Sequence, residues 1–446
     1  MNNPTPNFNS LFTNSARLPL SEAPRNVSFS QPNVPSLFAP ISDTPTVHET
    51  LALLKLWRAV AVVKQHLCGD SPTVWPLFVA WALRRFALFA AALTALNNPK
   101  LHVLPPLDIA WVWHSLLVAP EACFAMFARS GLSEFLDISF PMNQIADCID
   151  SSFCYFPDKL GVHNFHGLMA NYGKGYSLSY DYGSFNPEEV FPIYCPVSKN
   201  LLAQVSLSHF VCSSFLVRSQ EGVVTHHSLA RRQSDADHKL SINTPEWPNF
   251  SSPGTPDTST PPSPLSSCLL PISLKSPFES ALPLLHLTIE EDCLQILGDW
   301  IDHLVLSPVQ NMVDAENWIF HPNMHIMLAA AVKRYSKFWK LFSRSPAGQV
   351  PVPTLDIRLV WYAHMARFKE YADFSLYHSK SIVVPPRSGS QTTQEFKTTA
   401  ALYQKRFHTP YCPCGHLEGS LAYAQDTCTL SCYRHVYELL APSYDQ

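Results

Sequence analysis

The chain has 446 residues, of which 46% are hydrophobic and 12% aromatic, enough to bury two or three separate cores. Its formal net charge of −4 excludes the broadly basic surface of a general nucleic-acid or anionic-membrane binder. Glycine is scarce at 14 residues and proline abundant at 39, which predicts irregular stretches between compact segments.

The 12 cysteines are scattered, and the first 47 residues contain no basic-then-apolar secretory signal. We therefore expect reduced thiols and a cytoplasmic or nuclear location. The longest apolar segment, 74–96, carries Arg84 and Arg85 at its centre, where a membrane-spanning helix tolerates charge poorly. No transmembrane segment is predicted.

Residues 1–44 are polar and proline-punctuated, which predicts a disordered N-terminus before a helical module at 45–160. Apolar residues recur at helical spacing from His48 to Cys68, and a second helix covers 74–96. The next helix begins near Asp108, which follows two prolines and is expected to be its N-cap. A further helix is expected between Phe140 and Pro157.

The second half of the chain is predicted to contain a linker and another helical module. Residues 161–227 are expected to form a small β or irregular subdomain, with strands at 176–180, 190–194 and 202–207. Pro, Ser and Thr dominate 228–281, which predicts a long disordered linker. Helical patterning returns at 286–306, 324–342 and 356–374, within a module at 282–380, and 381–446 form a C-terminal extension with a cysteine cluster.

One sequence pattern occurs twice, roughly 250 residues apart. The segment from Pro105 to His114 reappears from Pro353 to Tyr362, and 82–86 parallels 331–335 further upstream at nearly equal spacing. Two matches at nearly equal spacing indicate two related modules. The predicted fold is therefore mainly α: two repeat-related helical bundles, a small β or irregular subdomain and a long disordered linker.

Each motif helix places its apolar residues on one face, which predicts a buried stripe. The residues that define the motif are Leu107, Ile109 and Trp113 in the first copy and Leu355, Ile357 and Trp361 in the second. His364 lies on the stripe and His114 lies off it. For both histidines a satisfied core position is favoured over a ligand role.

Four motif residues are candidate catalytic groups, because carboxylates and imidazoles can bind metals or move protons: Asp108, His114, Asp356 and His364. Neither copy has the paired histidines of a helical zinc protease, and no phosphate loop or nucleophile elbow occurs. A Ser-His-Asp or Cys-His site assembled in space stays open. Cys123 and Cys148 lack a basic neighbour and are interpreted as structural thiols.

The C-terminal extension holds the best metal candidates. They form two groups, Cys412, Cys414 and His416, then Cys428, Cys432 and His435. Thiolates and imidazoles suit zinc, but these spacings differ from the C-x2-C of zinc knuckles. Two interpretations stay open, a structural zinc held mainly by the cysteines or free thiols. Cys195 stands like half of a zinc ribbon, with Ser198 near the place of the missing cysteine.

These segments resemble the glycine-rich domain-containing protein-like family, and its fungal branch in particular. The family hallmark is a proline, then Leu-Asp-Ile, apolar residues and Trp-His-x-His. The stretch from Pro105 to His114, with Pro120 and Cys123, resembles it, and 353–364 is a more divergent copy. The segments 140–157 and 396–414 also resemble that branch. Leu116 and Tyr362 replace family histidines, which weakens a catalytic role.

The resemblance implies no established reaction. We expect a non-enzymatic intracellular scaffold or interaction protein whose partner is another protein. The first alternative is a metal-dependent oxygenase or hydrolase that uses the histidines and aspartates of both motifs. The second, an RNA-associated stress or developmental factor, follows from the resemblance alone, and the negative net charge opposes it. Apart from the zinc of the first interpretation, no cofactor or small-molecule substrate is identified.

Overall fold

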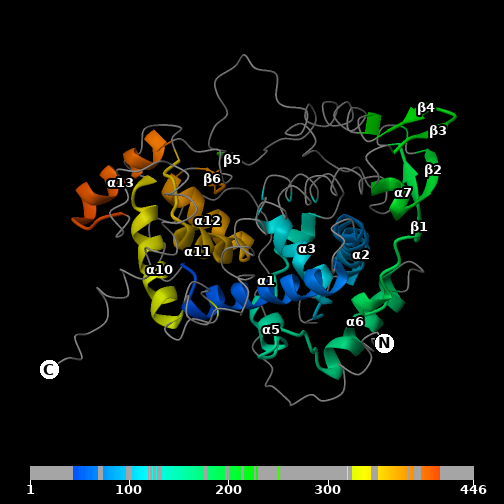
Figure 1. Cartoon of the computed structure of the whole chain (residues 1–446), viewed down its shortest axis with the longest axis horizontal. Coiled ribbons are helices and arrows are strands. Elements are labelled where there is room, and N and C mark those ends of the chain that lie inside the picture. Colours follow the sequence, from blue (N-terminus) through cyan, green and yellow to red (C-terminus); the bar gives the residue numbers. More distant parts are fainter. Residues whose placement is uncertain are drawn as a thin grey trace, which may run out of the picture. The chain divides into compact units, whose positions relative to one another are not determined.

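The computed structural model describes the helical and strand-bearing parts of the chain (Figure 1). The described residues are 44–68, 74–96, 103–118, 120, 123, 127, 133–173, 178–195, 198, 200–211, 215–225, 228–229, 250–251, 319, 324–342, 350–379, 381–385 and 393–411. The expected disordered N-terminus and linker lie almost entirely outside these residues, and the helix expected at 286–306 lies entirely outside them. The prediction of a mainly helical fold with few short strands is confirmed.

The chain divides into two compact units. Among the described residues, unit 1 runs from Lys55 to Leu229, and unit 2 comprises 44–54, 250–251 and 319–411. The division falls within helix α1 (Val47–Cys68), between Leu54 and Lys55.

Helix α1 begins at a capping box. The Thr46 hydroxyl accepts the Glu49 N–H at 3.1 Å, and the Glu49 carboxylate accepts the Thr46 N–H at 2.7 Å. This reciprocal pair satisfies two backbone donors that a helix start leaves without a partner. The start of α1 is therefore fixed by local sequence, within one residue of the prediction.

Unit 1 is built around α2 (Val74–Leu96), which contacts α3 (Leu107–Leu117), the 3-10 helix η3 (Ser133–Asp137), α6 (Lys159–Tyr172) and α7 (Leu207–Val211). A short helix, α5 (Met142–Asp147), comes between η3 and α6 in the sequence. By length and composition alone α2 could cross a membrane, but most of its residues are buried within the fold. It is apolar on all sides because it is surrounded by other elements.

Helix α6 occupies residues that were mostly expected to be irregular. Asp158 caps it by accepting the Gly161 N–H at 2.6 Å, and Phe165, Leu168 and Met169 supply its buried face. Two glycines and two histidines weaken its intrinsic helix propensity, so burial against α2 decides its conformation.

The small β element consists of two antiparallel pairs. Strand β1 (Val190–Tyr194) pairs with β2 (Leu201–Ser206), with a register shift at Ile193/Tyr194, and β3 (Val217–Ser219) pairs with β4 (Gly222–Val224). Gly222 has φ +106°, which the tight β3–β4 turn requires and a side chain would oppose. The first two strands were predicted, but 178–180 is not a strand. A 3-10 turn, η4 (Tyr182–Ser184), precedes β1.

Unit 2 contains α10 (Met324–Trp339), α11 (Leu355–Met365), α12 (Phe368–Ser379) and α13 (Thr393–Phe407). Strand β6 (Ile382–Val383) pairs in parallel with β5 (Phe250–Ser251). The single helix expected at 356–374 is in fact two helices. The Arg367 N–H bonds to the His364 carbonyl, three residues back, which tightens the last turn of α11 and ends it.

Candidate functional site

The two motif helices begin one residue earlier than predicted, and neither aspartate is an N-cap. Pro106 precedes α3 and Thr354 precedes α11, so Asp108 and Asp356 are each the second residue of their helix. Extended backbone at Pro106 (φ −55°, ψ 156°) brings the chain directly into the helix. The carboxylates are therefore available for partners outside their own helices.

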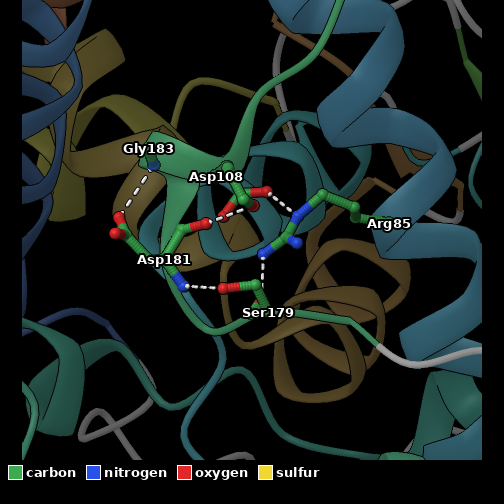
Figure 2. Close-up of polar contacts among 6 residues, drawn as sticks. Arg85, Asp108, Ser179, Asp181 and Gly183 are labelled. Carbon is green, nitrogen blue, oxygen red and sulfur yellow. Dashed lines mark hydrogen bonds and ion pairs between the residues drawn. The ribbon is translucent and has the colours of Figure 1, made fainter. Parts of the chain in front are cut away.

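Asp108 forms a buried ion pair with Arg85 of α2 (Figure 2). The Arg85 Nε donates to Asp108 Oδ2 at 2.6 Å, and the two side chains are only 4% and 0% exposed. A second guanidinium nitrogen donates to the Ser179 carbonyl at 2.8 Å, and the Trp81 ring lies 4.3 Å from the guanidinium carbon. Arg85 thus joins α2, the start of α3 and the segment that follows α6.

Asp356 forms the corresponding ion pair with Arg334 of α10. The Arg334 Nε donates to Asp356 Oδ2 at 2.6 Å, and the side chains are 15% and 4% exposed. Thr354 accepts from Arg334 at 2.9 Å and donates to the other Asp356 oxygen, Oδ1. Pro106 stands in the place of Thr354 in unit 1 and has no hydroxyl, and no described donor reaches Asp108 Oδ1.

Buried tyrosines bind the backbone just before each motif helix. In unit 1 the Tyr180 hydroxyl contacts the Leu104 carbonyl at 3.1 Å, and the Tyr155 hydroxyl donates to the Pro105 carbonyl at 2.8 Å. In unit 2 the Tyr411 hydroxyl donates to the Val352 carbonyl at 2.6 Å. Burial raises the pKa of all three phenols, so they stay neutral donors.

His114 lies in the core of unit 1, although the sequence placed it off the buried stripe. It is 1% exposed, and its ring lies 5.9 Å from both the Trp57 and the Phe140 rings. Every residue from Leu107 to Leu117 is buried, so α3 has no solvent face. The sequence predicted one buried face for this helix, whereas all of its faces are buried.

His364 lies in the core of unit 2. It is 0% exposed, and its Nδ1 is 2.8 Å from the Tyr335 hydroxyl. The Phe374 and Tyr371 rings lie 4.8 and 5.2 Å away. Burial, followed by the nearby Arg367 and His378, lowers the pKa of His364 well below its usual value. The imidazole is therefore neutral at physiological pH.

The motif residues build hydrophobic cores. The sixth predicted motif residue, Leu355, is the first residue of α11. The other five are almost fully buried: Leu107, Ile109, Trp113, Ile357 and Trp361. Within each unit the motif aspartate and histidine have different partners. No group of three or more His, Cys, Asp and Glu side chains suited to a metal occurs in the described part of the chain.

Of the cysteines considered in the sequence analysis, Cys123, Cys148 and Cys195 lie within the described residues. Cys123 is fully buried, and burial raises its pKa. Burial and the neighbouring carboxylates of Asp158 and Asp147 raise the pKa of Cys148 to about 11, so this thiol is protonated at neutral pH. The tail candidates lie outside the described residues: Cys412, Cys414, His416, Cys428, Cys432 and His435.

Cys195 directly follows β1, and the sequence has no second cysteine between it and β2. The Ser198 N–H approaches the Cys195 sulfur at 3.5 Å, while the Ser198 hydroxyl donates to Glu221 at 2.6 Å. Asn200 donates to the same Glu221 oxygen at 2.9 Å. Glu221 therefore links the two hairpins through hydrogen bonds.

Sequence reasoning missed the arginines and tyrosines that hold the motif helices. Arg85 and Arg334 occupy matching positions of the two aligned segments, and Arg85 lies inside an apolar helix. A charged side chain inside an apolar helix needs a partner of opposite charge in the core, so the position of Arg85 in the sequence was itself a sign of a buried ion pair. Periodicity gave no signal for the tyrosines, because they lie far from the motifs in the sequence, although Tyr155 and Tyr411 stand in the segments that resemble the family.

The comparison with protein-family models supports the family resemblance. The model of the glycine-rich domain-containing protein-like family matches residues 307–373, which include α10, α11 and the first half of α12. The comparisons with curated proteins and with solved structures found no match. The resemblance to the fungal branch stays a prediction. Residues 307–373 are therefore similar to the glycine-rich domain-containing protein-like family.

Proposed function

We propose that this protein is a non-enzymatic interaction protein, a scaffold built from two related helical modules. The observation that carries this proposal is the use of the motif aspartates. Each is held in an ion pair with the arginine at the matching position of the preceding helix, at 2.6 Å in both units; the pair is buried in unit 1 and half-buried in unit 2. The most distinctive part of the motif therefore stabilises the module.

The matching contacts extend beyond the ion pairs. Leu104 and Val352 stand at the same distance before the motif aspartates, and a buried tyrosine contacts the carbonyl of each. Both tyrosines lie in the segment that follows a further helix, α6 in unit 1 and α13 in unit 2. These parallels support an origin of the two modules by duplication of a longer segment than the sequence pattern covers.

The aromatic packing is also parallel. The rings of Phe89 and Trp113 lie 6.2 Å apart with 55° between their planes, and those of Phe338 and Trp361 lie 5.6 Å apart with 58°. The four residues occupy matching positions in the aligned segments. Two modules with the same internal contacts and different outer residues suit a protein that presents surfaces to partners.

The metal-enzyme alternative would require the motif residues to face a substrate. Their side chains are instead surrounded by protein in each unit: Asp108 and Asp356 by the arginine sites, and His114 and His364 by aromatic rings. Exposing either carboxylate would leave an arginine without its partner in a buried place, at a cost of about 3–5 kcal/mol. In a structural role the two aspartates keep their arginine partners, and this cost does not arise.

The proposal is tested by removing the negative charge from each motif. Asp108→Asn leaves the buried Arg85 guanidinium without its countercharge, and Asp356→Asn does the same for the half-buried Arg334 guanidinium. We expect the free energy of unfolding of the affected unit to fall by about 3–5 kcal/mol, measured by urea denaturation and circular dichroism. Asp147→Asn, at an exposed position of α5, is the matched control and should change it by no more than about 0.5 kcal/mol.

A second variant separates charge loss from a general packing defect. Replacing the whole pair with apolar residues, Arg85→Met with Asp108→Leu, leaves no buried charge and should cost less stability than Asp108→Asn alone. If both Asp→Asn variants unfold like the wild type, the aspartates are not structural, and the scaffold proposal loses its main support to the enzyme alternative.

A further inference from the structure

The exposed surface of unit 2 carries a cluster of positive charge that the cores do not use. Lys333 and Lys337 lie in α10 at positions i and i+4, and Lys340 comes directly after the last residue of the helix, in the turn that continues it. Residues 324–342 contain no Asp or Glu. The i, i+4 spacing places Lys333 and Lys337 on one side of the helix. Lys333 and Lys340 are exposed and Lys337 is half-buried.

The last turn of α13 adds Arg406 at the same place, with Lys405 next to it in the sequence. The Arg406 guanidinium donates to the Lys340 carbonyl at 2.5 Å. Phe407 joins the two helices: its ring centre lies 5.7 Å from the Lys337 nitrogen and 5.7 Å from the Arg406 guanidinium carbon. Together with exposed Lys405, these side chains form what we call the basic patch: Lys333, Lys337, Lys340, Lys405 and Arg406.

Helix ends explain only part of the basic patch. Cations are favoured in the last turn of a helix because they offset its dipole, which accounts for Lys337, Lys405 and Arg406. Lys333 lies further back in α10, and no carboxylate of the described residues pairs with Lys333, Lys337 or Lys405. Like charges at i and i+4 destabilise a helix slightly, so Lys333 and Lys337 lower the stability of α10. The stability of the fold therefore does not account for their presence.

We propose that the basic patch binds an acidic, extended segment of a partner protein, which deepens the scaffold proposal and rests on it for the kind of partner. Lys333 and Lys337 are separated by a rise of about 6 Å along the helix. Alternate residues of an extended peptide are about 6.6 Å apart, so acidic side chains at every second position match the lysines. The cation–π contacts with Phe407 restrain Lys337 and Arg406, which lowers the entropy cost of binding.

The charge of the whole chain favours a peptide over a polyanion. The net charge of −4 repels a nucleic acid or an anionic membrane at long range. A short acidic segment interacts mainly within a Debye length, about 8 Å at physiological salt, where the local positive charge dominates. The Phe407 ring already contacts two cations, so it serves them rather than a nucleobase.

The test measures binding of a fluorescein-labelled ten-residue peptide of alternating Glu and Ser to the full chain, by fluorescence anisotropy. The charge reversal Lys333→Glu with Lys337→Glu should weaken binding at least tenfold. The matched control, Lys159→Glu with Arg218→Glu, changes the net charge equally at exposed positions of unit 1 and should change affinity less than threefold. Lys333→Gln with Lys337→Gln should also weaken binding, and serves if charge reversal prevents folding.

Three outcomes would overturn the proposal. The first is no binding of the peptide by the wild type, and the second is an equal loss in the patch and control variants. The third is tighter, patch-dependent binding of a 20-nucleotide single-stranded RNA or of phosphatidylserine-containing vesicles, which would assign the patch to that ligand. None of these results affects the unfolding data for Asp108→Asn and Asp356→Asn, so failure of this inference and failure of the scaffold proposal are distinguishable.

Discussion

Asp108 and Asp356 show what keeps an ionisable side chain inside a helical module. Each carboxylate accepts a short hydrogen bond from an arginine Nε, and each arginine makes a second hydrogen bond to a nearby oxygen. A buried charge is tolerated when it is paired with an opposite charge. Asp356 Oδ1 also accepts a hydrogen bond from Thr354, whereas no described donor reaches Asp108 Oδ1, so in unit 1 the pairing with Arg85 is the main compensation. The motif aspartates are therefore tied to the arginines of the preceding helices.

His364 makes stability depend on pH. Its folded-state pKa lies well below the unfolded value of about 6.5, so only the unfolded chain takes up this proton as the pH falls through 6.5. The stability that the neutral imidazole contributes is complete above that pH and is lost below it, at up to about 1.4 kcal/mol for each pH unit. Urea unfolding between pH 7.5 and 5 should show this loss for the wild type.

His364→Gln is the variant that isolates this effect, since an amide can still contact the Tyr335 hydroxyl but does not titrate. The variant should lose less stability than the wild type over the same pH interval. His66→Gln, at an exposed position of α1, is the control and should keep the wild-type slope. Equal slopes for all three proteins would show that His364 is not the buried titrating group.

At the scale of elements, the motif helices are positioned by their N-terminal ends. Arginine from the preceding helix bonds to the first turn, while tyrosine from a later segment bonds to the carbonyls before it. Each motif helix is thereby connected to a preceding and a following part of the chain. Such connections fix the direction in which the helix enters the core, and the Trp-rich face then packs against the aromatic rings around it.

The two N-terminal ends differ at the residue before the helix, which is Thr354 in unit 2 and Pro106 in unit 1, and this difference gives a prediction. Thr354→Val removes the hydroxyl that donates to Asp356 Oδ1 and accepts from Arg334, so a buried carboxylate oxygen loses its donor. Thermal unfolding should show a loss of about 1–3 kcal/mol. Thr398→Val, whose hydroxyl bonds only within its own helix at an exposed site, is the control and should lose less. An equal loss would indicate that methyl packing, and not the Asp356 bond, decides the result.

At the scale of the whole molecule, the chain contains two units with separate cores. Unit 1 buries aromatic rings around α2 and α3, and unit 2 buries another set around α10, α11 and α12. The family match lies within 307–373, so it falls on the second unit. The basic patch belongs to that unit too, in a chain whose net charge is negative.

Separate cores predict that local damage stays local. Asp356→Asn should speed amide hydrogen exchange in α10 and α11, because it destabilises the unit that holds Arg334. Exchange in α2 and α3 should stay within about twofold of the wild type, with Asp108→Asn giving the reverse pattern. Hydrogen exchange followed by mass spectrometry reads both sets of helices in one experiment. Faster exchange in all four helices would show that the two units unfold as one.

The sequence by itself determined the long helices, because their apolar periodicity and stop signals are local. The bounds of α2 follow from a dense apolar run and the Asn97-Asn98-Pro99 stop, and α1 was predicted to within one residue. It also identified the aligned segments that contain Trp113 and Trp361, both of which are buried. Local patterns predict such features since they depend on neighbours a few residues away.

Only the tertiary structure decided what the motif polar residues do. Arg85 and Asp108 are 23 residues apart, and Tyr180 and Leu104 are 76 apart, so no periodicity relates them. The same holds for α6, whose weak local propensity is overcome by burial against α2. A carboxylate after a proline has the local signature of a cap, but a buried arginine nearby offers a stronger, charge-assisted bond. That competition is settled by packing at long sequence separation, which local sequence does not encode.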